Sequence, residues 1–201
     1  MVLDVSITTT LLIAIGAVSV AALNFRPDWR ERCLFRPYWF LRRRQYATVV
    51  TSGFVHADYG HLFFNAFTLW SFGAAVERAM GSARFLVLYV FGLLVANAGT
   101  WLSHRRDPNY ATLGASGAIL AVLFASVVYY PTGSIYIMFV PIPVPAPVFA
   151  VGYLAYSLYA AKRNIGRVNH DAHFSGALAG LAFVAVTDPG AWRHAIWQLT
   201  R

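Results

Sequence analysis

Six apolar segments, separated by charged or proline-containing stretches, constrain this 201-residue chain more than any other feature. They cover residues 7–25, 60–76, 85–102, 116–130, 146–161 and 172–186. Hydrophobic residues make up 58% of the chain and charged residues only 12%, whereas an average soluble domain is about 25% charged. The pattern predicts an all-α polytopic membrane protein, in which residues 1–201 form a single domain of six transmembrane helices.

The net charge of +8 is concentrated near the first apolar segment. Seven arginines lie between Arg26 and Arg44, interleaved with tryptophan, tyrosine and phenylalanine. Cationic and aromatic residues beside apolar spans are typical of the lipid headgroup interface. We therefore expect membrane lipid as a partner and no nucleic acid. Because the first four residues carry no basic charge, the first segment is predicted to be a retained span and not a cleaved signal peptide.

Two of the segments are short for transmembrane helices. Residues 116–130 and 172–186 offer fifteen positions each, whereas a span needs about 20 residues to cross roughly 30 Å of hydrocarbon. A short helix among longer ones leaves a recess above its N-terminus, where polar groups require protein or water as partners. The sequence thus predicts a polar cavity inside the bundle. Between the fourth and fifth segments, a run of prolines predicts an extended linker (Pro141, Pro143, Pro145 and Pro147).

Three potentially reactive side chains stand at the starts of alternate segments. With six spans, the second, fourth and sixth run in the same direction, so their N-termini share one membrane face. His61 begins the second, Ser116 the fourth and His173 the sixth. Asn65 follows His61 by four positions, which places both on one face of a helix.

Small residues predict that the fourth and sixth segments pack closely. Gly176 and Gly180 share a helical face with His173, and Gly117 begins a matching stripe that continues through Ala121 and Ala125. Such stripes let membrane helices approach one another. If the two stripes are in contact, Ser116 and His173 lie within hydrogen-bonding reach.

Each of these residues also has a structural interpretation. A serine at a helix start is most often an N-cap, and a single histidine at a membrane interface is most often structural. Asn65 is harder to explain, because an amide inside a span needs a partner or a function. His170 is an alternative to His173, but only His173 shares the glycine face.

The combination suits serine acyl transfer. An adjacent imidazole activates a serine hydroxyl, and an imidazole, an amide and a helix N-terminal N–H can stabilise the oxyanion. Asp171 lies two positions from His173 and therefore points away, which favours a Ser–His dyad. A zinc protease is disfavoured because neither Glu31 nor Glu77 lies between histidines, and an aspartyl protease because every aspartate falls at a segment end or in a loop.

Three blocks in this chain resemble the motifs of the rhomboid intramembrane serine proteases. They are HADYGHLFFNAFTLWSFG at 56–73, GASG at 114–117 and AHFSGALAG at 172–180. The resemblance implies Ser116 as nucleophile, His173 as general base, and His61, Asn65 and the Ser116 amide as the oxyanion hole. The motif glycines support packing (Gly114, Gly117, Gly176 and Gly180).

The same resemblance implies a cofactor-free and metal-free enzyme that cleaves transmembrane or membrane-anchored proteins, with the fifth helix as a lateral gate. It also implies a bacterial inner (plasma) membrane location with the active site facing the periplasm or exterior, although the positive-inside rule would place the arginine-rich loop in the cytoplasm. The alternatives are a catalytically inactive rhomboid-like protein that binds membrane clients and a small transporter. No inverted repeat supports the transporter.

Overall fold

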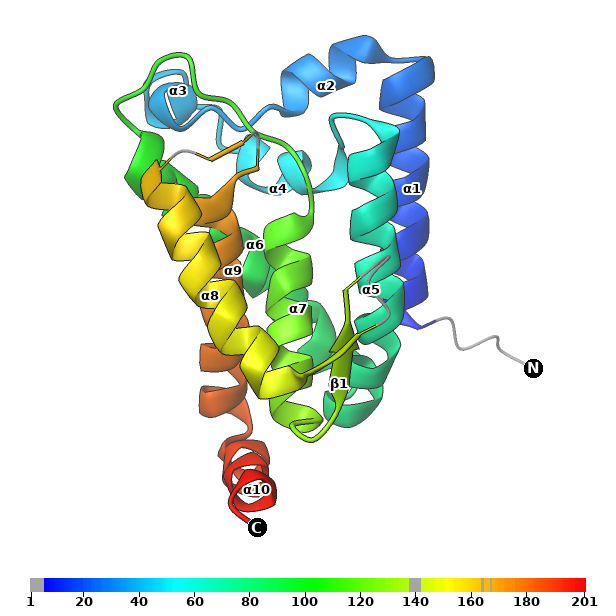
Figure 1. Ribbon diagram of the computed structural model, residues 1–201. Coiled ribbons are helices and arrows are strands. Elements are labelled where there is room, and N and C mark those ends of the chain that lie inside the picture. Colours follow the sequence, from blue (N-terminus) through cyan, green and yellow to red (C-terminus); the bar gives the residue numbers. More distant parts are fainter. Residues whose placement is uncertain (1–5, 138–141, 164, 167) are drawn as a thin grey trace, which may run out of the picture.

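The computed structural model describes residues 6–201 except 138–141, 164 and 167. The described part is a helical bundle with one small hairpin (Figure 1). Its elements are α1 (Ile7–Asn24), α2 (Pro27–Cys33), α3 (Pro37–Arg42), α4 (Thr48–Thr51), the 3-10 turn η1 (Ser52–Phe54), α5 (Tyr59–Met80), α6 (Ser82–His104), α7 (Ser116–Tyr129), β1 (Ser134–Tyr136), β2 (Pro143–Pro145), α8 (Ala146–Arg163), α9 (His170–Thr187) and α10 (Pro189–Leu199).

Every predicted apolar segment is a helix in the structure, namely α1 and α5 to α9. By length and hydropathy among the described residues, α1 and α6 can each cross a membrane, and α9 with α10 forms a third candidate that is bent by 107°. Helix α7 is apolar but has only 14 residues. The all-α membrane class is therefore confirmed, while the count of six spans stays a prediction.

Helix α7 is the centre of the bundle. All of its residues from Gly117 to Val128 are buried, and it packs against α5, α6, α8 and α9 (Figure 1). A helix that is hydrophobic on every side is stable only when other helices surround it. Surrounded in this way, α7 starts at Ser116, after the loop that follows α6 has entered the bundle.

Helices α7 and α9 are in close contact along their glycines. A Cβ atom on Gly176 would overlap the carbonyl oxygen of Gly117, and one on Gly180 would overlap that of Ala121. Gly117 in turn faces the side chain of Ala96 on α6. Larger residues at these positions would force the helices apart and would move the N-terminus of α9 away from α7.

Two expectations about segment ends are wrong. Helix α9 has 18 residues and not fifteen, because the Asn169 side chain caps it by accepting a hydrogen bond from the Ala172 amide at 3.0 Å. The proline run is not an extended linker throughout: Pro143–Pro145 pairs with β1 as an antiparallel strand, and Pro147 lies in the first turn of α8, where proline is tolerated. Pro141 lies outside the described residues.

At the opposite end from Ser116, a buried carboxylate ties α5 to the start of α1. Glu77 accepts hydrogen bonds from the amides of Ile7 at 2.8 Å and Thr8 at 2.9 Å, and from the Thr8 and Ser82 hydroxyls, both at 2.7 Å. The two amides are among those that a helix N-terminus leaves without intrahelical partners. The negative charge also favours the positive end of the α1 dipole.

Candidate active site

Ser116 is the first residue of α7 and is reached through an unusual backbone turn. Gly114 has φ +119°, a conformation that residues with a Cβ rarely adopt. The N-cap position is occupied by Ala115, which forms no side-chain cap. The interpretation of Ser116 as an N-cap is therefore wrong, and its hydroxyl is available for another contact. The Ser116 amide, as one of the first in the helix, has no carbonyl partner inside it.

The structure brings Ser116 and His173 together. Ser116 Oγ lies 2.8 Å from His173 Nε2, and both residues are half-buried. The two come from α7 and α9, and the glycine contacts described above hold those helices close enough for this bond. His173 itself is in the first turn of α9, where its amide bonds to the Asn169 carbonyl at 3.1 Å.

A third side chain, which the sequence does not single out, completes this group. The Tyr153 hydroxyl of α8 lies 3.0 Å from His173 Nδ1, and the two rings are nearly parallel, 24° apart, with centroids separated by 6.5 Å. One neutral tautomer satisfies both contacts: Nδ1–H donates to Tyr153 Oη, and Nε2 accepts from the Ser116 hydroxyl. Tyr153 is one of eleven tyrosines, and no local pattern distinguishes it from the others.

His61 and Asn65 lie on α5, beside the turn that leads to Ser116. A Cβ on Gly114 would be 2.5 Å from Cε1 of the His61 ring, so this glycine is required both by its φ and by the imidazole. Asn65 is buried, and its amide donates to the His61 carbonyl at 2.8 Å. Within the described part of the chain, no hydrogen bond joins either side chain to Ser116.

His56, the first histidine of the 56–73 block, supports the same turn from inside. It is fully buried, and its Nε2 accepts from the Ala115 amide at 3.5 Å. Its Nδ1 then donates to the Ser19 hydroxyl at 2.8 Å, and that hydroxyl donates to the Phe54 carbonyl at 3.0 Å. Burial, reinforced by the neighbouring His61, lowers the pKa of His56 to about 3 and keeps it neutral in this relay.

The other ionisable residues near His173 form contacts of their own. His170 Nε2 lies 3.1 Å from the Ile165 carbonyl oxygen, and no described bond joins it to Ser116. Asp171 accepts from the Ser103 hydroxyl at 2.7 Å and pairs with His104 at 2.9 Å, so it faces α6 and not the His173 ring. Among the described residues, no group of three histidine, cysteine, aspartate or glutamate side chains is arranged to hold a metal ion.

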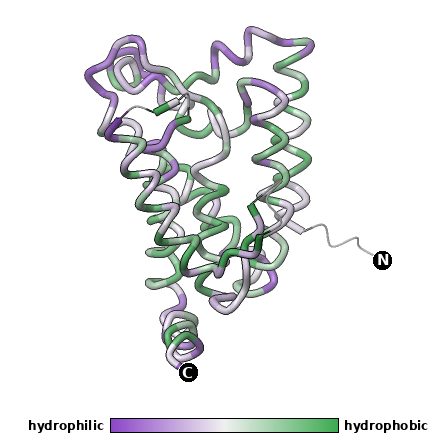
Figure 2. Tube along the Cα trace, viewed as in Figure 1, coloured by the Kyte–Doolittle hydropathy of each residue, from purple (hydrophilic) through white to green (hydrophobic). Residues whose placement is uncertain are grey.

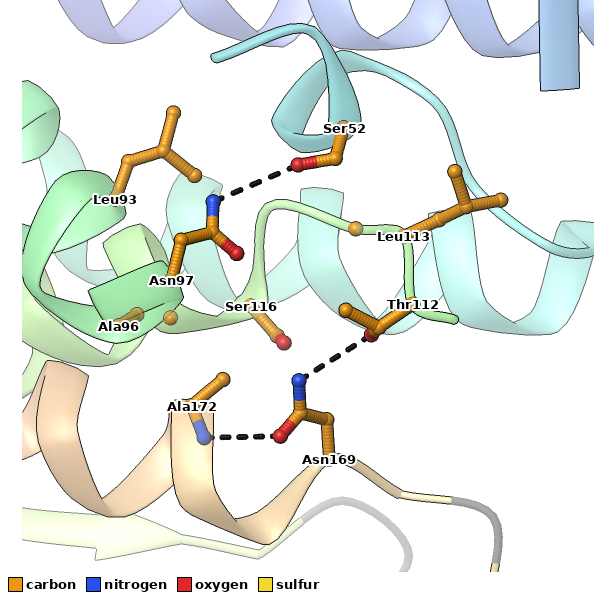
Figure 3. A pocket seen from close by; sticks show the side chains of 11 residues that line it. Ser52, Leu93, Ala96, Asn97, Thr112, Leu113, Ser116, Asn169 and Ala172 are labelled. Atoms are coloured by element: carbon orange, nitrogen blue, oxygen red, sulfur yellow. Dashed lines mark hydrogen bonds between the residues drawn. The ribbon is translucent and has the colours of Figure 1, made fainter. Parts of the chain in front are cut away.

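A small polar cavity lies behind Ser116. Its volume is about 10 Å³, roughly the space that one water molecule occupies. Figure 3 shows the Ser116 hydroxyl between Asn97, which donates to the Ser52 hydroxyl at 3.5 Å, and Asn169, which donates to that of Thr112 at 3.3 Å. Asn97 also bonds to the Val49 carbonyl at 2.7 Å. Hydrogen-bonding side chains therefore line the cavity beside the nucleophile candidate.

Comparison with known proteins defines the class to which this arrangement belongs. The family model described as the Rhomboid domain matches residues 43–189, which include Ser116, His173, His61 and Asn65. The chain belongs to the rhomboid family and is an integral membrane protein.

Relatives with this domain come from several organisms. The chain is 28% identical over 155 residues to the RHOMBOID-like protein 12, mitochondrial, of Arabidopsis thaliana. The alignment covers 69% of this chain and 46% of that relative. It is 28% identical over 153 residues to the human Presenilin-associated rhomboid-like protein, mitochondrial, in an alignment that covers 73% of this chain and 39% of that relative. It is 38% identical over 74 residues to the "Putative rhomboid protease YdcA" of Bacillus subtilis, in an alignment that covers 37% of this chain and 36% of that relative. The chain thus spans less than half the length of these relatives.

Proposed function

We propose that this rhomboid-family chain is a serine endopeptidase that cleaves transmembrane or membrane-anchored proteins. The observation that carries the proposal is the 2.8 Å contact between Ser116 Oγ and His173 Nε2, with Nδ1 of the same ring held by Tyr153. A nucleophile, a base in hydrogen-bond reach and a group that orients the base are the parts that covalent catalysis requires. The name of the Bacillus subtilis relative supports the same class of activity.

In the first step, Ser116 Oγ attacks the scissile carbonyl carbon while its proton passes to His173 Nε2. The resulting oxyanion needs donors, and the Ser116 amide, which has no partner inside α7 and lies at its positive end, is proposed as one of them. His61 and Asn65, beside the same turn, are proposed as the side-chain donors. Since Asn65 now bonds to the His61 carbonyl, it would have to exchange that bond to reach the oxyanion.

In the second step, the proton on His173 Nε2 passes to the leaving amine, and the C–N bond breaks to give an acyl-enzyme. Water then loses a proton to His173 and attacks the ester carbonyl, and His173 returns that proton to Ser116 Oγ. Every atom comes from the peptide, one water and the two side chains. This chemistry needs no metal or cofactor.

A substrate embedded in the membrane would have to reach the site from the side of the bundle. Helix α8, which brings Tyr153 to the dyad, packs mainly on α9 and α7, while α5 lies on the other side of α7 (Figure 1). We propose that a substrate segment enters between α5 and α8, with α8 as the gate. An unwound segment is required, because the carbonyl of an intact helix is hydrogen-bonded and shielded.

Labelling with a fluorophosphonate probe tests the proposal. The wild-type chain in detergent should be labelled and should cleave a model transmembrane substrate, whereas Ser116→Ala should do neither. A folded wild-type chain that is neither labelled nor active would support the client-binding alternative. Labelling that persists in Ser116→Ala would show that another residue is the nucleophile.

Membrane location and orientation are a separate part of the proposal. The named relatives include mitochondrial proteins and one from a bacterium, which supports a membrane protein and no particular membrane. We propose that the end bearing Ser116 faces away from the cytoplasm, as expected from the resemblance.

Cys33, the single cysteine, lies in α2 at that end (Figure 1). A membrane-impermeant maleimide should label it from outside intact cells, and labelling only after lysis would reverse the orientation.

A further inference from the structure

A basic crevice lies where α3 meets the end of α6, away from the dyad. Its volume is about 420 Å³, and it is lined by Leu41, Arg42, Trp101, Arg105 and Arg106. Figure 2 shows hydrophilic residues gathered around α3 at this end of the bundle. We infer that this crevice binds the phosphate headgroup of an anionic phospholipid. The inference goes beyond peptide cleavage and does not depend on it.

The arginines in this crevice have no acidic partner in the part of the chain that the structure describes. Among the described residues, no ion pair involves Arg42, Arg105 or Arg106. Three arginines of the first loop differ, since Arg26 and Arg32 pair with Asp28 at 3.0 and 3.5 Å and Arg36 pairs with Glu31. Three guanidinium groups around one crevice present many N–H donors, and their planar geometry matches phosphate oxygens.

Aromatic contacts hold two of these arginines in place. The Arg42 guanidinium lies 4.0 Å from the centre of the Tyr38 ring, and its Nη1 donates to the Tyr38 carbonyl at 2.7 Å. The Arg105 guanidinium lies 5.1 Å from the centre of the Trp101 ring. Stacking orders each side chain while most of its N–H donors remain available.

The two walls of the crevice are joined by contacts between distant parts of the chain. Trp39 of α3 donates from Nε1 to the Pro108 carbonyl at 3.1 Å, beyond the end of α6. Phe35 and Thr112 form a backbone bridge, with N–O distances of 2.9 and 3.0 Å in the two directions. The crevice is therefore part of the fold and not a chance gap between mobile loops.

An apolar stripe on α6 identifies the ligand as a lipid and not a free phosphate. Val87, Phe91, Leu94 and Leu102 are exposed large hydrophobic residues. Their spacing places them on one face of the helix, and Arg105 continues that face. A phospholipid bound by its phosphate at the arginines would lay its acyl chains along this stripe. A soluble anion would make no use of it.

Native mass spectrometry of the purified chain in detergent tests the inference. Palmitoyl-oleoyl phosphatidylglycerol should bind at least tenfold more tightly than the matching phosphatidylcholine. Arg105→Gln/Arg106→Gln should weaken phosphatidylglycerol binding about 25-fold, since each arginine near anionic lipid contributes a factor of about 5. The matched control is Arg30→Gln/Arg84→Gln, which removes the same charge from two exposed positions outside the crevice that form no ion pair among the described residues and should change binding less than threefold.

Two results would overturn the inference. Equal weakening by both double variants would mean diffuse surface charge, and displacement of the lipid by an equal concentration of glycerol 3-phosphate would mean a soluble phosphate ligand. Thermal unfolding followed by circular dichroism checks that both variants are folded. If the Arg105/Arg106 variant unfolds early, Arg42→Gln makes the same test from α3, with an expected loss of about fivefold.

Discussion

The two ends of this bundle treat buried polar groups in opposite ways. At the end where α5 turns into α6, the Glu77 carboxylate accepts four hydrogen bonds and has no capacity to spare. At the other end, the Ser116 hydroxyl has a single described partner, His173. Each group sits inside an apolar bundle, where an unpaired polar atom costs free energy.

Polar groups that stabilise the fold and polar groups that can take part in chemistry lie at different ends of this chain. A group with all of its hydrogen bonds formed, such as Glu77, holds α1 against α5 and contributes to the free energy of folding. A group with one partner and free donor or acceptor capacity can bind a substrate atom instead. The amide of Ser116, which has no partner inside α7, belongs to the second kind. Four predictions test this division.

The largest expected effect is on catalysis. Ser116→Ala and His173→Ala should each lower the turnover of a model transmembrane substrate by about 1,000-fold or more, because each removes one member of the nucleophile–base pair. Their thermal unfolding should match that of the wild type. Turnover and unfolding are measured on the same detergent-purified samples.

His170→Ala is the matched control for this first prediction. His170 lies three residues from His173 but bonds to the Ile165 carbonyl, so its turnover per folded molecule should stay within about threefold of wild type. Loss of activity in this variant comparable to that of His173→Ala would move the general base to His170.

The second prediction concerns Glu77, which should affect the stability of the fold and not catalysis. Glu77→Gln keeps the side-chain shape but replaces an acceptor oxygen with an NH₂ group facing N–H and O–H donors, so it should destabilise the fold by about 2–3 kcal/mol. Turnover per folded molecule should be unchanged. Glu31→Gln, at an exposed site, is the control for charge. An active-site defect in folded Glu77→Gln would show that the two ends are coupled.

The third prediction concerns the phenol that holds the base. Tyr153→Phe should lower kcat about tenfold with little change in KM, because the His173 Nδ1–H loses an acceptor worth roughly 1.4 kcal/mol as the imidazolium forms. Tyr156→Phe is the control on the same helix, since its ring contacts His170. A purely structural role for Tyr153 would instead appear as a lowered unfolding temperature with normal kcat.

The smallest expected effect is a pH dependence of stability from His56. Its pKa is about 3 in the folded chain and about 6.5 when unfolded, so between these two pH values the proton binds mainly to the unfolded chain. His56 should therefore contribute a fall in stability of about 1 kcal/mol between pH 6.5 and 5.5. His56→Gln, which does not titrate, should reduce the fall measured in denaturant titrations by that amount, and an unchanged fall would assign the pH dependence to other groups.

The six long helices and the proximity of Ser116 to His173 could be predicted from the sequence alone. Continuous apolar segments located all six long helices to within a few residues, because hydrophobic segments of that length have few other stable structures. Connectivity placed Ser116 and His173 on one face, and the glycines of α9 predicted its contact with α7. Local signals also account for the start of α5, where Asp58 caps the helix by accepting from the His61 amide at 2.7 Å.

The rest depended on contacts between residues far apart in the chain. Nothing local marks Tyr153 as the partner of His173, His56 as the support of Ala115, or Glu77 as the partner of Thr8, 69 positions away. A side chain's polarity shows that it needs a partner, but only the packed helices decide which one it meets. The composition and motifs of this chain thus determined a rhomboid-type helical membrane protein. Its tertiary structure decided which buried polar groups form all of their hydrogen bonds and which keep donor or acceptor capacity that a substrate can use.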